Sequence, residues 1–144
     1  MTYIIKHLFH ISASTEKVYK AIAGTEGLSH WWTTQTKGSE DVDGEIKFNF
    51  GEYQGPTMKI IELVPNKKIV WQCVESNGWL DHIFTFDLDE NDGKTRIRFS
   101  HEGWEDQGDF YAGCCFSWGR YLESLRQYCQ TGKGEGYGTP GYRQ

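Results

Sequence analysis

Apolar and polar residues alternate with a period of two over most of this chain. Along residues 3–11, every second side chain from Tyr3 to Ile11 falls on one face, which predicts a strand. The same period recurs in five further segments, at residues 45–50, 57–64, 68–75, 81–88 and 95–101. Each of these segments has one face rich in aromatic or β-branched residues, as expected for a strand with one buried side.

Short runs of turn-forming residues separate the predicted strands. They include Asp43-Gly44, Pro65-Asn66, Ser76-Asn77-Gly78 and Glu90-Asn91-Asp92-Gly93. Turns at this spacing are typical of consecutive hairpins. The pattern therefore predicts an antiparallel sheet with one face buried in the core and the other face exposed to solvent.

Two parts of the chain change to a helical period. After the first strand, Val18, Ala21 and Ile22 lie on one side of a helix that Ser12 or Ser14 can cap. A short second helix or turn follows at residues 25–32. Residues 109 to about 131 then form a single long predicted helix, with its inner stripe at Phe110, Cys114, Trp118, Tyr121, Leu125 and Cys129.

Two glycines, Gly113 and Gly119, lie inside the long helix. Each weakens a helix by roughly 1 kcal/mol relative to alanine. We expect them to let the helix approach the sheet closely. Because one helix cannot cover a flat sheet of six or seven strands, we expect the sheet to twist and curl around it.

The predicted fold class is therefore α+β, a helix-grip fold. In it, a curved antiparallel sheet of six to seven strands surrounds a long C-terminal helix, with two short helices after the first strand. The length of 144 residues suits one domain, which we assign to residues 1–132. Residues 133–144 form a glycine-rich tail, which alone should be flexible. Its aromatic residues could dock on the domain or on a neighbouring chain.

Aromatic residues make up 15% of the chain, with six Trp, eight Tyr and eight Phe. Rings this numerous on a concave sheet either pack as a core or leave a cavity, and we favour a cavity. The expected inward set is Trp31, Trp32, Phe48, Phe50, Trp71, Phe84, Phe86, Phe99, Trp104 and Trp118.

Charge and cysteine content exclude several classes of function. The net charge of −5 disfavours nucleic acid and anionic membrane surfaces as partners, and no apolar run is long enough to span a membrane. The four cysteines form no C-x-x-C pair, and the first residues lack the apolar core of a signal peptide. We therefore expect a cytoplasmic protein with free thiols and without membrane insertion.

Candidate catalytic groups are few. His82 and His101 fall on the inward faces of consecutive strands, where they could meet at one end of a pocket. With Glu102 they make only a weak metal site, because no metal-ligand spacing accompanies them. Glu105, Asp106 and Asp109 precede the long helix, where they favour its dipole. We assign no catalytic residue, no metal and no cofactor.

Several motifs together resemble one family. The first helix and the double-tryptophan segment of the START-like SRPBCC superfamily resemble two segments of this chain, Val18-Tyr-Lys-Ala-Ile22 and Glu26-Gly-Leu-Ser-His-Trp-Trp32. Three further segments resemble elements of one branch of this superfamily, the activators of the heat-shock-protein-90 ATPase. These segments are Pro65-Asn-Lys-Lys-Ile-Val-Trp71, Gly103-Trp104 and residues 118–132. The resemblance covers residues 1 to about 132. It implies the helix-grip fold and a cavity for an apolar ligand. Superfamily members include lipid binders, cyclases and stress proteins, so fold alone does not decide function.

Three functions remain open. The first is binding of a small apolar or amphipathic molecule, lipid-like or polyketide-like. Its expected walls are Trp32, Phe48, Trp71, Phe84, Phe99 and Trp118, and its expected polar contacts are His82, His101 and Tyr121. The second is a protein-interaction domain, either a chaperone regulator or a homodimer. The third is a cyclase or hydrolase with a pocket histidine as base.

Overall fold

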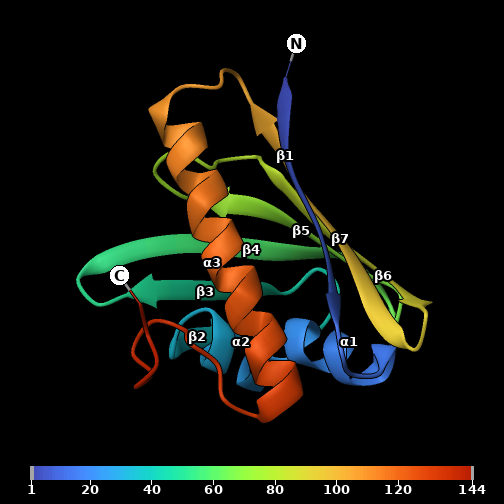
Figure 1. The fold of residues 1–144 in the computed structure, drawn as a ribbon. Coiled ribbons are helices and arrows are strands. Elements are labelled where there is room, and N and C mark those ends of the chain that lie inside the picture. The colour runs from blue at the N-terminus through green and yellow to red at the C-terminus, as the bar shows by residue number, and fades with distance from the viewer. Residues whose placement is uncertain (1, 144) are drawn as a thin grey trace.

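The seven strands within residues 2–143 belong to one antiparallel sheet. The computed structural model describes residues 2–143. The elements in chain order are β1 (Tyr3–Ile11), α1 (Thr15–Ala23), α2 (Thr25–Trp31), β2 (Gln35–Gly38), β3 (Glu45–Phe50), β4 (Tyr53–Val64), β5 (Lys68–Glu75), β6 (Ile83–Asn91), β7 (Lys94–Trp104) and α3 (Asp109–Thr131). The strand order is β1-β7-β6-β5-β4-β3-β2, so β1 and β2 are the edges. Figure 1 shows α3 crossing the sheet, with α1 and α2 beside its C-terminal end.

The hairpins form where the sequence supplies residues that accept a left-handed backbone. Asn66 (φ 64°) and Asp92 (φ 58°) sit in the β4–β5 and β6–β7 turns, and Gly93 (φ 80°) follows Asp92. Asparagine, aspartate and glycine tolerate this conformation better than other residues. Register shifts interrupt three of the strand pairs: β1–β7, β3–β4 and β4–β5. Such bulges bend strands and increase their twist, which lets the sheet curl around α3.

Side-chain and backbone caps fix the ends of the helices. Ser14 Oγ accepts a hydrogen bond from the Lys17 amide (3.1 Å), so the cap of α1 is the second of the two predicted serines. Gly132 ends α3 in the left-handed conformation (φ 83°), and its amide donates to the Tyr128 carbonyl (2.9 Å). No helix within residues 2–143 is long and apolar enough to cross a membrane.

Aromatic rings fill the centre of the molecule. Trp32 stacks parallel to Trp71 at 6.1 Å between centroids and packs against Phe48 at 4.3 Å. Trp71 meets Phe86 edge to face at 5.1 Å. The Trp31 indole is fully buried, and its N–H donates to the Ala21 carbonyl (2.9 Å), which ties α2 to α1. The interior beneath α3 is thus a packed aromatic core.

The fold confirms the predicted class, and the differences are local. The four-residue edge strand β2 was not predicted, since it shows no apolar alternation. The strand expected at 57–64 begins earlier, at Tyr53. The strand expected at 81–88 begins later, at Ile83, because Asp81 takes a left-handed conformation (φ 69°) in the preceding turn.

The expected role of the two helix glycines is wrong. A Cβ atom added at Gly113 would meet nothing within 4 Å, and one at Gly119 would meet only the His7 ring at 3.7 Å, an ordinary contact. Neither glycine is therefore needed for close packing. The inner stripe of α3 also differs from the prediction. Leu122 is buried whereas Phe110 is 54% exposed.

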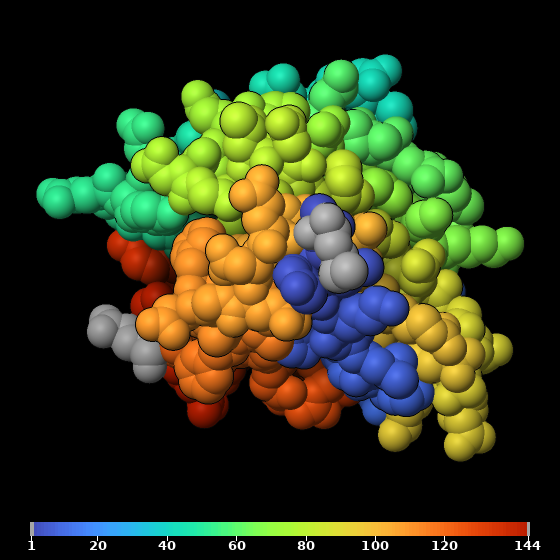
Figure 2. All heavy atoms as spheres, turned by 90° about the horizontal axis from the view of Figure 1, so that it is seen from above, coloured from blue at the N-terminus to red at the C-terminus, as the bar shows by residue number. Residues whose placement is uncertain are grey.

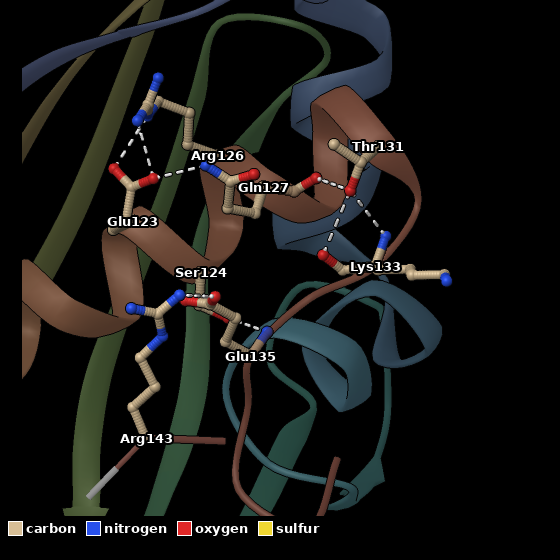
Figure 3. Close-up of polar contacts among 8 residues, drawn as sticks. All are labelled: Glu123, Ser124, Arg126, Gln127, Thr131, Lys133, Glu135 and Arg143. Carbon is tan, nitrogen blue, oxygen red and sulfur yellow. Dashed lines mark hydrogen bonds and ion pairs between the residues drawn. The ribbon is translucent and has the colours of Figure 1, made fainter. Parts of the chain in front are cut away.

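The glycine-rich tail lies against the domain over residues 133–143, and Gln144 is outside the described residues. The Tyr137 amide donates to the Trp32 carbonyl (2.8 Å), and the Thr34 amide donates to the Tyr137 carbonyl (2.9 Å). Figure 3 shows two more contacts of the tail. The Glu135 amide donates to Ser124 Oγ (2.7 Å), and Arg143 pairs with the Glu135 carboxylate (2.9 Å). These bonds hold in place a segment whose composition alone indicates flexibility.

Candidate functional site

An apolar pocket lies where the N-terminal half of α3 separates from the sheet. It has a volume of about 270 Å³. Its walls come from α3, from the β3–β4 hairpin and from the loop between β5 and β6. The end view of Figure 2 shows the first turns of α3 between β1 and the β3–β4 hairpin. The lining residues are Trp32, Phe50, Tyr53, Pro56, Ser76, Asn77, Trp79, Phe110, Cys114, Ser117, Trp118 and Tyr121.

Three indoles form the inner part of this pocket. Trp79 stacks nearly parallel to Trp118, with 6.0 Å between centroids and 15° between planes. Trp32 packs on the other side of Trp118 at 5.1 Å. Trp32 and Trp118 are almost fully buried, while Tyr53 and Phe110 at the rim are more than half exposed. The pocket therefore has a rigid aromatic wall and an accessible mouth.

The polar groups of the pocket include three donors, at Trp79, Tyr121 and Cys114, beside side chains that can also accept, at Ser76, Asn77 and Ser117. Burial raises the pKa of the Tyr121 hydroxyl, which therefore keeps its proton. Burial also raises the pKa of the Cys114 thiol, against a smaller opposing effect of the Trp79 indole. The buried Nε1 of Trp79 makes no regular hydrogen bond among the described residues, and the Cys114 sulfur is its weak partner. A thiol that stays protonated is a poor nucleophile, so the pocket is suited to binding more than to covalent chemistry.

The two candidate histidines meet directly beneath the pocket. His82 Nδ1 and His101 Nε2 are 2.9 Å apart, and the Trp118 indole N–H donates to His101 Nδ1 (3.0 Å). An indole nitrogen can only donate, so His101 Nδ1 must be the acceptor. His101 then carries its proton on Nε2 and donates it to His82 Nδ1. A chain of directed hydrogen bonds thus runs from the pocket wall to His82.

Burial keeps both imidazoles neutral. It lowers the pKa of His101 to about 2, with a further lowering from the charge of His82. Burial also lowers the pKa of His82, against smaller opposing effects of Glu105 and Asp81. An added proton on His82 Nδ1 would face the N–H of His101 Nε2, and one on His101 Nδ1 would face the indole N–H of Trp118. The pair is therefore held as neutral tautomers, and neither ring is free to act as a base at the pocket.

The structure separates the predicted site residues into two groups. Trp32, Trp118 and Tyr121 line the pocket. The remaining six lie in the packed core behind it, where each is less than one-tenth exposed: Phe48, Trp71, His82, Phe84, Phe99 and His101. The expectation that His82 and His101 meet is confirmed. His101 contacts the pocket wall through Trp118 and through Trp79, whose ring it meets edge to face at 4.9 Å between centroids.

Sequence reasoning missed most of the pocket rim. Trp79 lies in the loop between β5 and β6, and Tyr53 lies at the start of β4, outside the strands that the sequence predicts. Neither position belongs to a clear period-two pattern. A large aromatic residue inside an otherwise polar turn is the signal that could have marked Trp79.

The tail borders the pocket. The Tyr137 ring meets Phe50 edge to face at 5.7 Å, and Tyr142 packs on Tyr137 at 5.3 Å. A Cβ atom at Gly51 would collide with the Tyr137 hydroxyl, so the tail lies directly on the β3–β4 turn. Two pocket residues, Trp32 and Phe50, are thus held by the tail as well as by the sheet. No group of three or more potential metal ligands gathers within residues 2–143.

Comparison with known proteins places this geometry in a family. The model of the family described as activator of Hsp90 ATPase homolog 1-like protein matches residues 12–130. Among curated proteins, none matches the sequence. The Aha1 dimer from Colwellia psychrerythraea, determined in solution, is 34% identical, with a TM-score of 0.84 over 92% of this chain and 99% of that one.

More distant relatives share the fold. Protein SSP2350 from Staphylococcus saprophyticus is 19% identical, with a TM-score of 0.75 over 92% of this chain and 95% of that one. CalU16 from Micromonospora echinospora is 16% identical, with a TM-score of 0.72 over 96% of this chain and 77% of that one. The helix-grip architecture therefore persists where little sequence similarity remains.

Proposed function

Because this chain belongs to the family of activator of Hsp90 ATPase homolog 1-like proteins, whose fold leaves a space between helix and sheet, we propose that it binds a small, flat, largely apolar molecule. The observation that carries the proposal is the pocket of about 270 Å³ walled by Trp32, Trp79 and Trp118. Four free thiols fit a cytoplasmic location for this binding domain.

The pocket volume limits the size of the ligand. It lies just below the range of about 300–1,000 Å³ that is usual for sites of drug-sized molecules. A ligand of one or two aromatic rings would bury about 150–250 Å², as an aromatic side chain does. At about 25 cal/mol per Å² this burial stabilises the complex by roughly 4–6 kcal/mol before ordering costs. We therefore expect dissociation constants of tens of micromolar at best and about millimolar or weaker once ordering costs are included.

The donors in the pocket indicate the polar character of the ligand. Trp79 Nε1 has only the Cys114 sulfur as a weak partner, and the Tyr121 hydroxyl keeps its proton. A ligand that brings a carbonyl or ether oxygen to these atoms would satisfy a buried donor that is otherwise only weakly paired. An aromatic ketone, of the kind found in polyketides, fits this site better than a saturated fatty acid does.

A titration with matched ligands tests the proposal. The probes are 2-acetylnaphthalene, naphthalene and dodecanoate, with binding followed by quenching of tryptophan fluorescence. We expect saturable quenching in the order acetylnaphthalene, naphthalene, dodecanoate. Ser117→Phe would fill the pocket from an exposed position on α3 and abolish binding, whereas Ala112→Phe, on α3 but outside the lining, would not. Equal quenching of both variants would contradict the assignment of the site.

The 34% identical dimer supports a second candidate, a homodimer. The outer face of β1 exposes Leu8 (63%) and Ile4 (39%), and β1 is an edge of the sheet. Exposed apolar residues at a sheet edge are typical of association surfaces. Light scattering during size exclusion tests this. Leu8→Lys should convert a dimer to a monomer, and a monomeric wild-type chain at high concentration would rule the homodimer out.

A further inference from the structure

A second hollow, separate from the aromatic pocket, lies on the outer side of α3. It has a volume of about 850 Å³ and is bordered by β1, α3 and the tail. Two residues on the wall of this hollow, His7 and Cys115, carry groups that can react together. The His7 Nε2 atom lies 3.7 Å from the Cys115 Sγ atom. Cys115 faces away from its neighbour Cys114, which lines the aromatic pocket. The thiol and imidazole come from elements 108 residues apart in sequence, so the fold itself creates the pair.

Cys115 differs from the other three cysteines. Cys73 and Cys129 are fully buried, and burial raises the pKa of Cys129 to about 12. Burial also raises the pKa of Cys73 and of Cys114. Only Cys115 combines partial exposure, a position in an open hollow and an imidazole nitrogen at contact distance. The other three cysteines therefore serve as internal controls for a thiol reaction that depends on exposure and on a neighbouring imidazole.

Of the described charged side chains around the Cys115–His7 pair, one cation, Arg120, is not engaged in an ion pair. Glu123 faces His7 from α3 but is held by Arg126 (2.7 Å), and Arg143 of the tail is held by Glu135 (2.9 Å). Arg120 makes no ion pair within residues 2–143. Its guanidinium carbon lies 6.0 Å from the centroid of the exposed Phe116 ring. A flat anionic group could stack on Phe116 and pair with Arg120.

We propose that Cys115 and His7 form a reactive thiol–imidazole pair that undergoes thiol–disulfide exchange with small anionic disulfides. Partial burial lowers the pKa of His7, against a smaller raising effect of the Cys115 backbone, so the ring is neutral near pH 7 and its Nε2, 3.7 Å from the sulfur, can accept the thiol proton. The Cys115 thiolate attacks one sulfur of the disulfide R–S–S–R, and that S–S bond breaks. Cys115–S–S–R forms, and the departing R–S⁻ takes up a proton. The disulfide is the oxidant, so electrons balance within the exchange.

Two aromatic disulfides of different charge test the proposal on the full chain. The probes are the dianionic 5,5′-dithiobis(2-nitrobenzoate) and the neutral 4,4′-dithiodipyridine. In the native protein, one thiol should react quickly with either probe, and all four should react in urea. Cys115→Ser should remove the fast phase, and Cys114→Ser should keep it. A fast phase that survives Cys115→Ser would overturn the proposal.

The roles of the two partners are tested separately. His7→Gln should slow both probes at pH 7 by about tenfold, because the Cys115 thiol then lacks the imidazole nitrogen that accepts its proton. Arg120→Gln should slow the dianionic probe several-fold and leave the neutral probe unchanged. If His7→Gln failed to fold, the wild-type rate as a function of pH would decide. A rate that levels off below pH 8 supports the pair, and one that rises through pH 8.5 refutes it.

Discussion

The hydrogen-bond chain from Trp118 through His101 to His82 makes a specific prediction about acid stability. His101 has no exposed surface, and both of its ring nitrogens are engaged. Burial lowers its pKa to about 2 in the folded protein, against about 6.5 for a solvated histidine. Replacing His101 by glutamine removes the titrating group while retaining one amide donor and one carbonyl acceptor. The substitution should therefore change the pH dependence of unfolding.

The sign and size of the effect follow from proton linkage. A folded-state pKa below the unfolded value means that the unfolded chain binds more protons once the pH falls below 6.5. Wild-type stability therefore falls as the pH is lowered from 6.5 toward 2. Each pH unit below 6.5 costs about 1.4 kcal/mol for one histidine that stays neutral when folded. At pH 4.5 the contribution of His101 is a loss of about 2.7 kcal/mol relative to pH 7.5.

Urea unfolding, followed by tryptophan fluorescence at pH 7.5 and pH 4.5, measures this loss. Carboxylates and the histidines outside the His82–His101 pair also titrate, but they contribute equally to wild type and variant. The wild type should therefore lose about 2.7 kcal/mol more than His101→Gln between the two pH values. His10→Gln, at an exposed position on β1, controls for removal of a histidine in general. If wild type and His101→Gln lost the same free energy, the neutral buried pair would be refuted.

Three further changes test other parts of the structure. Trp118→Phe leaves His101 Nδ1 without a donor and should cost about 1–3 kcal/mol in urea unfolding, more than the loss of ring area alone; a cost near zero would contradict the indole bond. Gly113→Ala meets open space on an exposed helix face and should stabilise the protein by about 1 kcal/mol, seen as a higher melting temperature; destabilisation would show a contact that the structure lacks. Removing residues 133–144 should raise hydrogen exchange at Thr34, because the acceptor of its amide is Tyr137; unchanged protection would show that the tail does not hold this segment.

Much of the fold was predictable because each local signal agreed with the others. Period-two segments, turn residues and one long helical pattern left few ways to arrange a single domain. The meeting of His82 and His101 was predicted from inward positions on neighbouring strands, and it holds although His82 lies one residue before β6. The short strand β2 was not predictable, since its sequence Gln35-Thr-Lys-Gly38 is polar and exposed on both faces. Its strand character comes from pairing with β3, which is a tertiary effect.

The candidate site was harder to predict than the fold. The periodicity of the sequence shows on which face of a strand or helix a side chain lies, but it does not show how deeply that side chain is buried. Phe48, Trp71 and Trp32 all point inward, yet only Trp32 reaches the pocket. Depth depends on how α3 crosses the sheet, and this direction is decided by packing among many residues. The tail shows the same limit. Its glycines indicate flexibility, but the bonds of Tyr137 to Trp32 and Thr34 depend on a surface that exists only after folding.

The location of the pocket follows from how the core is filled. Near its C-terminal end, α3 buries Leu125 and Cys129 and lies beside α2, and the hollow that borders this end is lined largely by charged and polar residues of α1 and α2. In the middle, the rings around Trp71 occupy the volume beneath the helix. The remaining space lies under the first turns of α3, where Cys114 and Ser117 are small and Phe110 points outward. A ligand there must contact the β3–β4 hairpin and the β5–β6 loop. Selectivity within the family should therefore depend on these two segments, which can change without disturbing the aromatic core.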